Sequence, residues 1–300
     1  MTAEGTGGLA EHGFAGFASP ADVVRGLAEI GYLADEAIAT TVFLAQALGK
    51  PLLVEGPAGV GKTELAKAVA AATGAELIRL QCYEGLDEAR ALYEFNYKKQ
   101  LLAIQAAPGD QGWQRTHDDI FSEEFLLERP LLAAIRRTGP TVLLIDEADK
   151  ADVEVEGLLL EVLSDFQVTI PELGTVSATR RPFVVITSNA ARELSEALKR
   201  RCLYLYLTYP EPEREREIVL SQVPGIEAAL AEQLVRTVGT LRELEVKKAP
   251  SIAETVDWAR TLLALGLDEL DEDAVARTLG VVLKHASDQE RAVKELGLRG

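Results

Sequence analysis

Residues 56–63 form the stretch that most constrains the fold of this chain. They read Gly-Pro-Ala-Gly-Val-Gly-Lys-Thr, which is a glycine, four residues and then Gly-Lys-Thr. The apolar run before them predicts a short buried strand over residues 51–54, and the residues after them predict a helix over 64–72. A strand, a glycine-rich turn and a helix in this order predict an α/β fold around a parallel sheet.

The chemistry of phosphate binding needs these residue types. Glycines let successive backbone N–H groups surround phosphate oxygens, and the helix N-terminus adds the positive end of its dipole. Lys62 is expected to reach the β- and γ-phosphates, and the Thr63 hydroxyl to bind Mg²⁺. The alternative, a glycine-rich turn with an incidental Lys-Thr pair, is disfavoured by the flanking strand and helix. The predicted nucleotide-binding residues are Tyr32, Gly56, Pro57, Ala58, Gly59, Val60, Gly61, Lys62, Thr63 and Glu64. For Tyr32, stacking on an adenine ring and ordinary packing both stay open.

A second motif follows a continuous apolar run at residues 141–145. This run is typical of a central strand covered on both faces, and it ends in the carboxylates Asp146 and Glu147. Downstream of a phosphate loop this is the Walker B pattern. Asp146 is expected to hold Mg²⁺ and Glu147 to polarise the attacking water. The alternative is a strand that simply ends in solvated acids.

Two further sites of interest follow later strands. Residues 183–187 predict a strand, and Asn189 comes just after it. Beside the Walker B strand, Asn189 orients the lytic water or touches the γ-phosphate. The alternative is that it caps a helix. Arg200 and Arg201 close a short helix that is expected to begin at residue 193. There they complement the helix dipole, or one of them serves as an arginine finger for a neighbouring subunit.

Helices and strands are expected elsewhere along the nucleotide-binding part. Ser19, Pro20 and Asp22 are typical of a helix start, and a second helix is expected over residues 35–48. Residues 76–81 predict a strand. An aromatic-rich segment follows at 82–100, and residues 121–137 predict one or two amphipathic helices. Residues 166–181 predict a β-hairpin.

Pro210-Glu211-Pro212 marks a domain boundary, and the pattern beyond it is helical throughout. Ser251 and Glu254 have the spacing of a capping box. We therefore predict a disordered lead over residues 1–18, a nucleotide-binding domain over 19–210 and a helical domain over 211–300.

Charge and composition argue against several classes of function and location. The formal net charge is −17, and acids outnumber bases both before and after residue 210, which argues against a nucleic acid as the main partner. Cys82 and Cys202 lie far apart without a metal-binding pattern, so we expect a reducing, cytoplasmic location. No apolar run is long enough to span a membrane.

Taken together, these motifs resemble those of an AAA+ ATPase over nearly the whole chain beyond residue 20. The resemblance implies a P-loop NTPase core with a five-stranded parallel sheet between helices, a β-hairpin insertion ahead of the Asn189 strand, and a C-terminal all-α lid. The hairpin and an insertion in helix 2 together mark the branch that holds MoxR proteins, magnesium chelatase subunits and replicative helicases. Three stretches closely resemble the MoxR subgroup that includes CoxD, at residues 80–88, 120–131 and 167–174.

This resemblance implies a homo-hexameric ring with ATP held between subunits. Asn189 is then the sensor 1 residue and Arg201, or else Arg200, the finger. CoxD-like proteins accompany carbon monoxide dehydrogenase, so the implied client is a molybdenum–copper enzyme, with a von Willebrand factor A-domain partner. The sensor 2 arginine of many MoxR proteins is missing from residues 249–253. Lys247, Lys248 or Arg260 replaces it, or the lid couples weakly to nucleotide.

The predicted function is therefore a Mg²⁺-dependent ATP hydrolase acting as a chaperone. Four aromatics in the 82–100 segment, Tyr83, Tyr93, Phe95 and Tyr97, either grip the client or pack locally. A nucleic-acid remodeller with Lys98, Lys99, Arg180 or Arg181 in a channel and a nucleotide-gated scaffold with little hydrolysis are the alternative functions.

Overall fold

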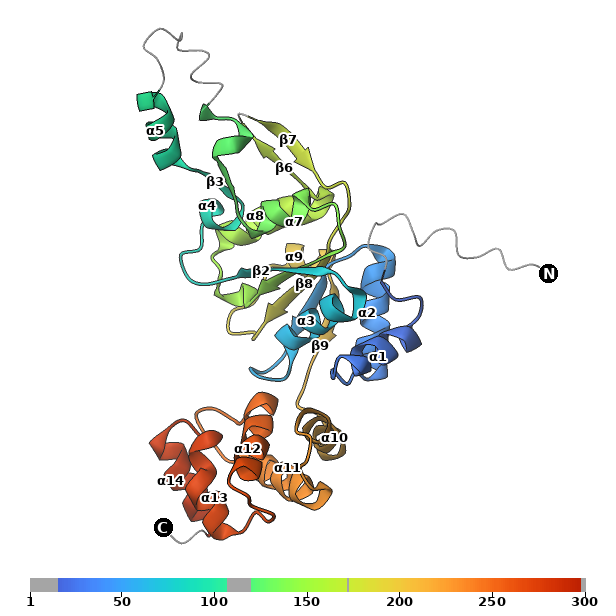
Figure 1. The fold of residues 1–300 in the computed structure, drawn as a ribbon, viewed down its shortest axis with the longest axis vertical. Helices are drawn as coiled ribbons and strands as arrows, with labels where there is room; N and C mark the ends of the chain where they lie inside the picture. Colours follow the sequence, from blue (N-terminus) through green and yellow to red (C-terminus); the bar gives the residue numbers. More distant parts are fainter. Residues whose placement is uncertain (1–15, 107–119, 172, 298–300) are drawn as a thin grey trace, which may run out of the picture. The chain divides into compact units, whose positions relative to one another are not determined.

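The computed structural model describes residues 16–106, 120–171 and 173–297. Its central feature is a five-stranded sheet in the order β2-β5-β8-β1-β9, in which every neighbouring pair is parallel (Figure 1). The strands are β1 (Leu52–Glu55), β2 (Glu76–Gln81), β5 (Thr141–Asp146), β8 (Phe183–Ser188) and β9 (Leu203–Tyr206). The predicted five-stranded parallel core is confirmed.

The three inner strands are the most apolar. Every residue of β1, β5 and β8 is buried, as the continuous hydrophobic runs predict. Because all five strands are parallel, their carboxyl ends lie at one edge of the sheet. Glu55, Asp146 and Ser188 are the last residues of adjacent or near-adjacent strands there. The sheet thus brings the two motifs' strand ends to the same edge.

Helices flank this sheet, and their ends follow local rules. They are α1 (Pro20–Glu29), α2 (Glu36–Leu48), α3 (Lys62–Thr73), α7 (Pro130–Arg136), α8 (Val153–Asp165) and α9 (Glu196–Arg201). The Ser19 side chain accepts a hydrogen bond from the Asp22 N–H, so the predicted helix start is confirmed. Helix α2 begins after the N-cap Asp35 and ends at Gly49, whose φ of 60° is left-handed.

The predicted disordered lead falls mostly outside the described residues, which begin at residue 16. Phe17, however, is buried at 9% exposure and exchanges two hydrogen bonds with the Gln46 side chain of α2. Phe17 is therefore an ordered residue within the predicted lead, because an apolar side chain and paired backbone groups anchor it.

The segment between β2 and β5 differs from the sequence-based expectation. It contains α4 (Glu88–Ala91), β3 (Tyr93–Phe95), α5 (Tyr97–Ala106), the 3₁₀ turn η1 (Glu123–Phe125) and β4 (Leu126–Glu128). The predicted helix over 121–137 is wrong before Pro130, because residues 126–128 pair antiparallel with β3. Pro130 occupies the first turn of α7 and keeps Arg129 extended, so the helix begins only there.

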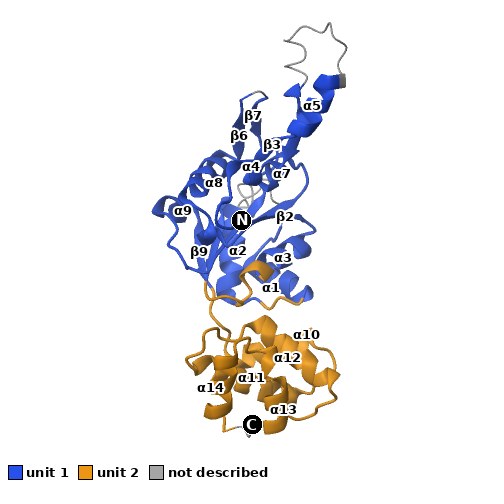
Figure 2. Ribbon diagram, turned by 90° about the vertical axis from the view of Figure 1, so that its left-hand side faces the viewer, with its two compact units in different colours: residues 1–30, 34–55, 65–206 blue, residues 31–33, 56–64, 207–300 orange. Residues whose placement is uncertain are grey.

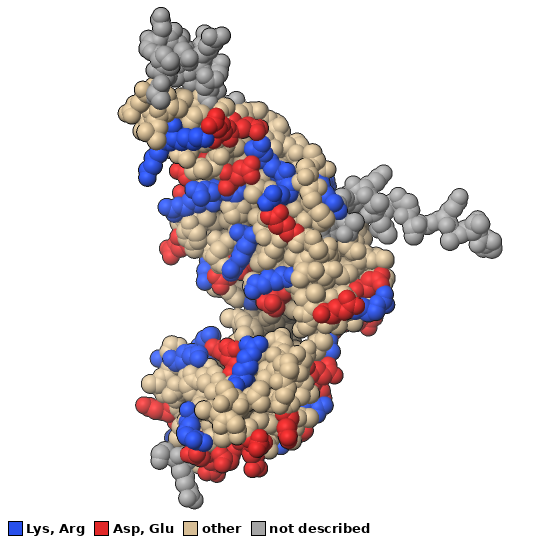
Figure 3. Space-filling model, viewed as in Figure 1, with Lys and Arg blue, Asp and Glu red and all other residues tan. Residues whose placement is uncertain are grey.

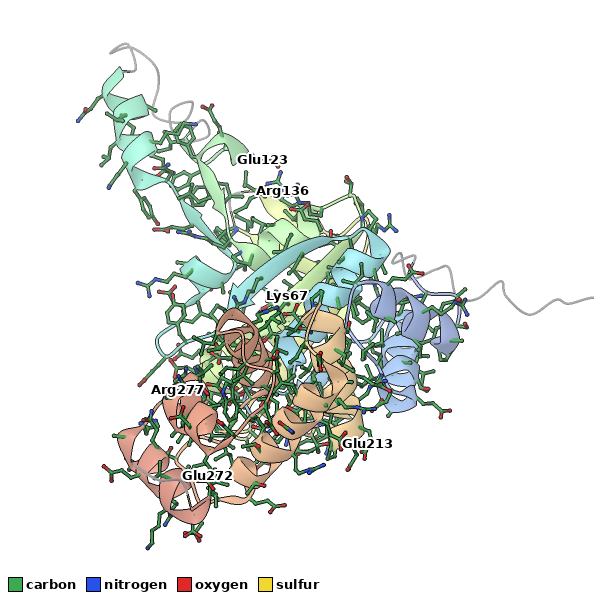
Figure 4. All side chains as sticks on the ribbon, turned by 60° about the horizontal axis from the view of Figure 1, so that its bottom comes forward. Lys67, Glu123, Arg136, Glu213, Glu272 and Arg277 are labelled. Carbon is green, nitrogen blue, oxygen red and sulfur yellow. The ribbon has the colours of Figure 1, made fainter. Side chains whose placement is uncertain are left out.

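Two smaller features complete this part of the chain. The predicted β-hairpin is confirmed as β6 (Gln167–Ile170) and β7 (Gly174–Ser177). Glu123 of η1 and Arg136 of α7, labelled in Figure 4, form an ion pair of 2.7 Å that ties the inserted segment to α7.

The C-terminal residues are helical, as predicted. They form α10 (Pro212–Gln222), α11 (Ala228–Glu243), α12 (Ile252–Ala264), α13 (Glu272–Thr278), the 3₁₀ turn η3 (Leu279–Val281) and α14 (Ala286–Glu295). Their core includes the fully buried Trp258, whose Nε1–H donates to the Thr278 hydroxyl at 2.7 Å. Both hydrogen bonds of the predicted Ser251–Glu254 capping box are present.

The chain divides into two compact units, coloured separately in Figure 2. The first contains residues 1–30, 34–55 and 65–206, and the second contains 31–33, 56–64 and 207–300. By its contacts the phosphate loop thus belongs with the C-terminal helices, although it is joined covalently to β1 and α3.

Candidate functional site

The phosphate loop follows β1 directly and leads into α3. Its three glycines all have positive φ angles, of 150° at Gly56, 77° at Gly59 and 97° at Gly61. A Cβ at Gly56 would lie 2.0 Å from the Leu207 carbonyl oxygen, so a side chain does not fit there. Glycine is required here because only glycine adopts these conformations and permits such close approaches.

The Lys62 ammonium lies within its own loop. It is buried at 6% exposure and donates to the carbonyl oxygens of Gly56 at 2.8 Å and Pro57 at 2.7 Å. A phosphate oxygen is a charged acceptor and makes the stronger hydrogen bond with an ammonium. Lys62 is therefore placed to exchange a backbone carbonyl for a phosphate oxygen without leaving the loop.

Tyr32 lies against the same loop. Its ring carbon Cε2 and its hydroxyl are 3.8 and 3.9 Å from the position that a Cβ would take at Gly61. Thr63 is half-buried in the first turn of α3, and Glu64 beside it is exposed. Tyr32 is thus brought next to the loop from a segment 24 residues upstream of its first glycine, which fits either of its two predicted roles.

Asp146, the last residue of β5, is buried at 2% exposure and is fully hydrogen-bonded. Its Oδ1 accepts from the Thr187 hydroxyl at 2.5 Å. Its Oδ2 accepts from Arg79 of β2, through Nε at 3.0 Å and a terminal nitrogen at 2.5 Å. Neighbouring strands on both sides therefore orient this carboxylate.

Glu147 has an unusual backbone and two side-chain partners. Its φ of 57° is left-handed, and its N–H donates to the Thr187 hydroxyl at 2.9 Å. Its Oε2 accepts from Gln81 at 2.8 Å and from Lys150 at 2.7 Å, and the hydrogen bond with Glu147 raises the pKa of Lys150. Left-handed backbone at a non-glycine residue costs free energy and concentrates at functional sites.

The sequence analysis did not identify the residues that form hydrogen bonds with Asp146 and Glu147. Arg79 and Gln81 are near the end of β2, Thr187 is near the end of β8, and Lys150 is in η2 (Ala148–Lys150). The available signal is that they are polar residues at strand ends, but only the strand order shows which strands neighbour β5.

Asn189 directly follows β8 and is half-buried. It is not the N-cap of α9, since Ser195 fills that position and accepts from the Leu198 N–H. The helix-cap alternative for Asn189 at α9 is therefore wrong. The adjacent Ala190 has a left-handed φ of 56°, and its N–H donates to the Ser188 hydroxyl.

Arg200 and Arg201 are exposed at the end of α9. The Arg201 Nε donates to the Ser164 hydroxyl of α8 at 3.0 Å, and another of its nitrogens lies 3.4 Å from the Ala197 carbonyl. Both arginines thus remain on the surface, where a second subunit has access to them.

Two of the three sensor 2 candidates named from the sequence, Lys248 and Arg260, have local ion-pair partners. Lys248 pairs with Glu254 at 3.0 Å, and Arg260 pairs with Asp257 at 3.2 Å. Neither pair contains a phosphate-loop residue.

Among the described residues, no group of three or more His, Cys, Asp or Glu side chains could hold a metal ion. Magnesium does not need one, because it is commonly held by one or two protein oxygens together with nucleotide phosphates. A carboxylate such as Asp146 and a hydroxyl such as Thr63 are the oxygen donors that fit this ion.

The thiols are poorly reactive. Cys82 and Cys202 are both free, and burial raises the pKa of each to about 12, with the Asp146 charge adding to the effect at Cys82. The thiolate is the nucleophile, so neither side chain serves as one at neutral pH.

Charges of both signs alternate over the face shown in Figure 3. Lysines and arginines there lie among acidic side chains rather than in one continuous basic surface, as the net charge of −17 leads us to expect. In the described part of the chain, no helix has the length and apolarity needed to cross a membrane.

Comparisons with known proteins identify the family of the chain and several relatives. The family model of AAA domains (dynein-related subfamily) matches residues 51–202. The chaperone protein ClpB 2 of Parasynechococcus marenigrum is 37% identical over 139 residues, which cover 45% of this chain and 13% of ClpB 2. An uncharacterized protein of Staphylococcus haemolyticus, SH1500, is 26% identical over 255 residues, covering 81% of this chain and 88% of that protein.

Among solved structures, the Thermotoga maritima RuvB Holliday junction branch migration motor is similar with a TM-score of 0.48 and 16% identity. The alignment covers 94% of this chain and 85% of RuvB. The ClpB relatives are much longer than this chain, whose match spans 13% to 16% of their length.

Proposed function

The chain belongs to the family of AAA domains, in its dynein-related subfamily, and we propose that it is the Mg²⁺-dependent motor of a MoxR-type chaperone that remodels or matures a metalloenzyme. Family membership makes it an ATP-hydrolysing P-loop ATPase, so ATP is its nucleotide. The observation that carries the proposal is the position of the two motifs at one edge of the sheet. The phosphate loop begins after β1, and Asp146 is the last residue of β5, with Glu147 directly after it.

The phosphate loop binds the nucleotide in this proposal. Residues 56–64 surround the phosphates, Lys62 contacts the β- and γ-phosphates, and Tyr32 packs against the nucleotide beside Gly61. Supporting this are the positive φ angles of the three glycines and the position of Tyr32 at 3.8 Å from the Gly61 Cβ position. Successive N–H groups in such a turn form an anion-binding concavity.

Glu147 polarises the attacking water, and Asn189 orients it. The left-handed backbone of Glu147 and its hydrogen bond to Thr187 hold its carboxylate at the end of β5. Gln81 and Lys150 both donate to Oε2 of that carboxylate. Because an ionised carboxylate has two acceptor oxygens, Glu147 can accept from the water as well. Asp146 and Thr63 hold the magnesium ion, which, when bound, neutralises charge on the phosphates.

We further propose that the protein works as a homo-hexameric ring in the cytoplasm. Arg201, or else Arg200, would then reach the nucleotide of the adjacent subunit. The surface position of both side chains supports this, since a finger acting in trans must be accessible. In functional terms we propose residues 19–210 as the nucleotide-binding domain and 211–300 as the lid.

The client is proposed to be a molybdenum metalloenzyme, with a von Willebrand factor A-domain protein as partner. The MoxR- and CoxD-like stretches support this, and similarity to a chaperone protein supports remodelling as the activity. Two of the four aromatics suit a client-gripping role: Tyr83 and Tyr97 are exposed at 41% and 61%, whereas Phe95 is buried and packs edge-to-face on Tyr93 and Phe121.

The test compares ATP turnover of the wild-type protein with that of Glu147→Gln and Glu154→Gln. Glu154 is an exposed acid in the first turn of α8 and serves as the matched control. We expect Glu147→Gln to lower kcat by about 10²-fold or more while ATP still binds, because the general base is lost. Turnover that Glu147→Gln leaves unchanged would contradict the role of this residue.

The same proteins test the client. In a reconstituted maturation of a molybdenum–copper carbon monoxide dehydrogenase, the wild type is expected to activate the enzyme and Glu147→Gln is not. ATPase activity that DNA stimulates, in a salt-sensitive way and without any effect of the metalloenzyme, would instead favour a nucleic-acid remodeller.

A further inference from the structure

The C-terminal helices hold the phosphate loop by its carbonyl groups. The Ile252 N–H, at the start of α12, donates to the Gly59 carbonyl at 3.1 Å. The Tyr209 hydroxyl, in the segment before α10, donates to the Ala58 carbonyl at 3.3 Å. All four residues belong to the second compact unit (Figure 2). The approach is close, since a Cβ at Gly59 would lie 2.1 Å from the Cβ of Ser251.

One guanidinium group fixes both of these donors. Arg242 of α11 has its Cζ 4.2 Å from the centre of the Tyr209 ring, a cation–π distance. Its Nε donates to the Pro250 carbonyl at 2.8 Å, two residues before Ile252. Arg242 therefore contacts the ring of one donor and the chain that leads into the other.

Arg242 is itself held firmly. It forms a bidentate pair with Glu215 of α10, at 2.5 and 2.8 Å, in which both side chains are largely buried. The buried Thr255 hydroxyl lies 2.8 Å from Glu215 and 3.1 Å from the Ser251 carbonyl. A planar guanidinium with two parallel hydrogen bonds has a defined orientation, so its contacts with Tyr209 and Pro250 are defined as well.

Tyr209 keeps its proton for this contact. Burial raises the pKa of the Tyr209 phenol, and the Arg242 charge opposes that shift only in part. The hydroxyl is therefore neutral at physiological pH and remains a donor to the Ala58 carbonyl.

Holding a carbonyl also orients an N–H. The Ala58 C=O and the Gly59 N–H belong to one planar trans peptide and point in opposite directions, and the same holds for the Gly59 C=O and the Val60 N–H. Tyr209 and Ile252 donate hydrogen bonds to the carbonyl groups of these two peptides. The other sides of the two planes carry the N–H groups of Gly59 and Val60, which belong to the anion-binding loop.

We propose that Arg242 is a positioning residue for nucleotide binding. Through Tyr209 and the start of α12 it orients the peptides of residues 58–60 so that their N–H groups are ready for phosphate. The lid is thereby coupled to the nucleotide through backbone carbonyls, a route that needs no arginine on the phosphates. The proposal rests on the ATP-binding function of the loop.

Two variants separate positioning from support of the fold. Tyr209→Phe removes only the hydroxyl and keeps the ring on Arg242. The double variant Glu215→Met/Arg242→Met removes the buried charges together, because removing one alone would leave the other unpaired. Arg236→Ala is the control on the same helix, since Arg236 forms an exposed pair with Glu232 at 2.9 Å.

The measurements are the Kd of a fluorescent ADP analogue, kcat and KM for ATP, and the thermal unfolding midpoint. We expect Tyr209→Phe to raise Kd and KM by about two- to tenfold, the value of one neutral hydrogen bond, with kcat and the midpoint near wild type. The double variant should raise Kd further, and Arg236→Ala should leave all values unchanged. Amide exchange at Ile252 should accelerate in the double variant more than in the rest of α12.

Normal Kd and KM in Tyr209→Phe would overturn the proposal, whatever the double variant does to stability. A wild-type protein that does not bind the ADP analogue would overturn the ATPase assignment as well, and this outcome is distinct from the first.

Discussion

At the residue scale, one hydroxyl joins the two carboxylates of the Walker B motif. Thr187 donates to Asp146 and accepts from the Glu147 N–H, and it is 1% exposed. Because a hydroxyl is both donor and acceptor, a single side chain satisfies a buried carboxylate oxygen and a backbone N–H in left-handed conformation. An apolar or acidic side chain of similar size could not donate and accept in this way.

We therefore expect Thr187→Val to lower both stability and ATP turnover, although it preserves the shape of the side chain. It leaves the Glu147 N–H and Asp146 Oδ1 without this partner, which is expected to cost about 1–3 kcal/mol of unfolding free energy and to lower ATP turnover. Thr187→Ser should restore most of both. Denaturant unfolding and steady-state ATPase assays check this, with Thr169→Val in the exposed hairpin as control. Full turnover in Thr187→Val would show that the bridge is dispensable.

At the element scale, helix starts follow local chemistry, whereas short strands depend on distant partners. Ser19, Asp35, Ser195 and Ser251 each cap the helix that follows with a side-chain oxygen. Strand β4, by contrast, exists only because β3 lies 33 residues earlier in the chain and pairs with it, Tyr93 opposite Glu128. An amphipathic pattern over residues 121–137 contains no information about that partner.

The capping box of α12 predicts that the free energy of unfolding depends on pH. Burial alone would raise the pKa of Glu254, but hydrogen bonds from Ser251 and Lys248 hold it below its usual range. A carboxylate with a depressed folded-state pKa stabilises the fold above its unfolded pKa of about 4.3, and this stabilisation is lost as pH falls through the folded value.

Glu254→Gln keeps the capping geometry and removes the charge. We expect it to lower the unfolding free energy at neutral pH by about 1 kcal/mol or less, and the difference from wild type to vanish as the pH falls below the lowered folded-state pKa of Glu254. Denaturant unfolding at several pH values measures this, with the exposed Glu243→Gln as control. A difference that stays constant with pH would exclude the ionised carboxylate as its source.

At the scale of the whole molecule, the proposed assembly into a ring leads to a prediction about ATPase activity. If Arg201 completes the site of the next subunit, specific ATPase activity must rise with protein concentration as subunits associate. Within one chain Arg201 donates to Ser164 of α8, a contact that a neighbouring nucleotide would replace.

Arg201→Ala is expected to lower kcat by about 10³-fold while rings persist in sizing chromatography, because it removes charge stabilisation from the transition state. Arg200→Ala serves as the comparison that identifies the finger. Activity that is independent of concentration and indifferent to both substitutions would mean that each chain hydrolyses ATP by itself.

Features with local causes could be predicted from the sequence. The phosphate loop, the apolar strand before Asp146 and Glu147, and the capped helices could all be predicted, because residues within a few positions decide φ, burial pattern and capping. The order of strands and helices predicted an α/β fold around a parallel sheet, and the apolar pattern after residue 210 predicted the C-terminal helices. The number of five strands was implied by the resemblance to AAA+ ATPases.

The distant residues that complete the site could be identified only from the folded chain. Arg79 and Gln81 reach the Walker B carboxylates because β2 is the neighbour of β5, and Thr187 does so because β8 is the neighbour on the other side. Arg242 contacts Tyr209 because α11 packs against α10. Strand order and helix packing are set by the summed burial of the whole core, which no local window of sequence contains.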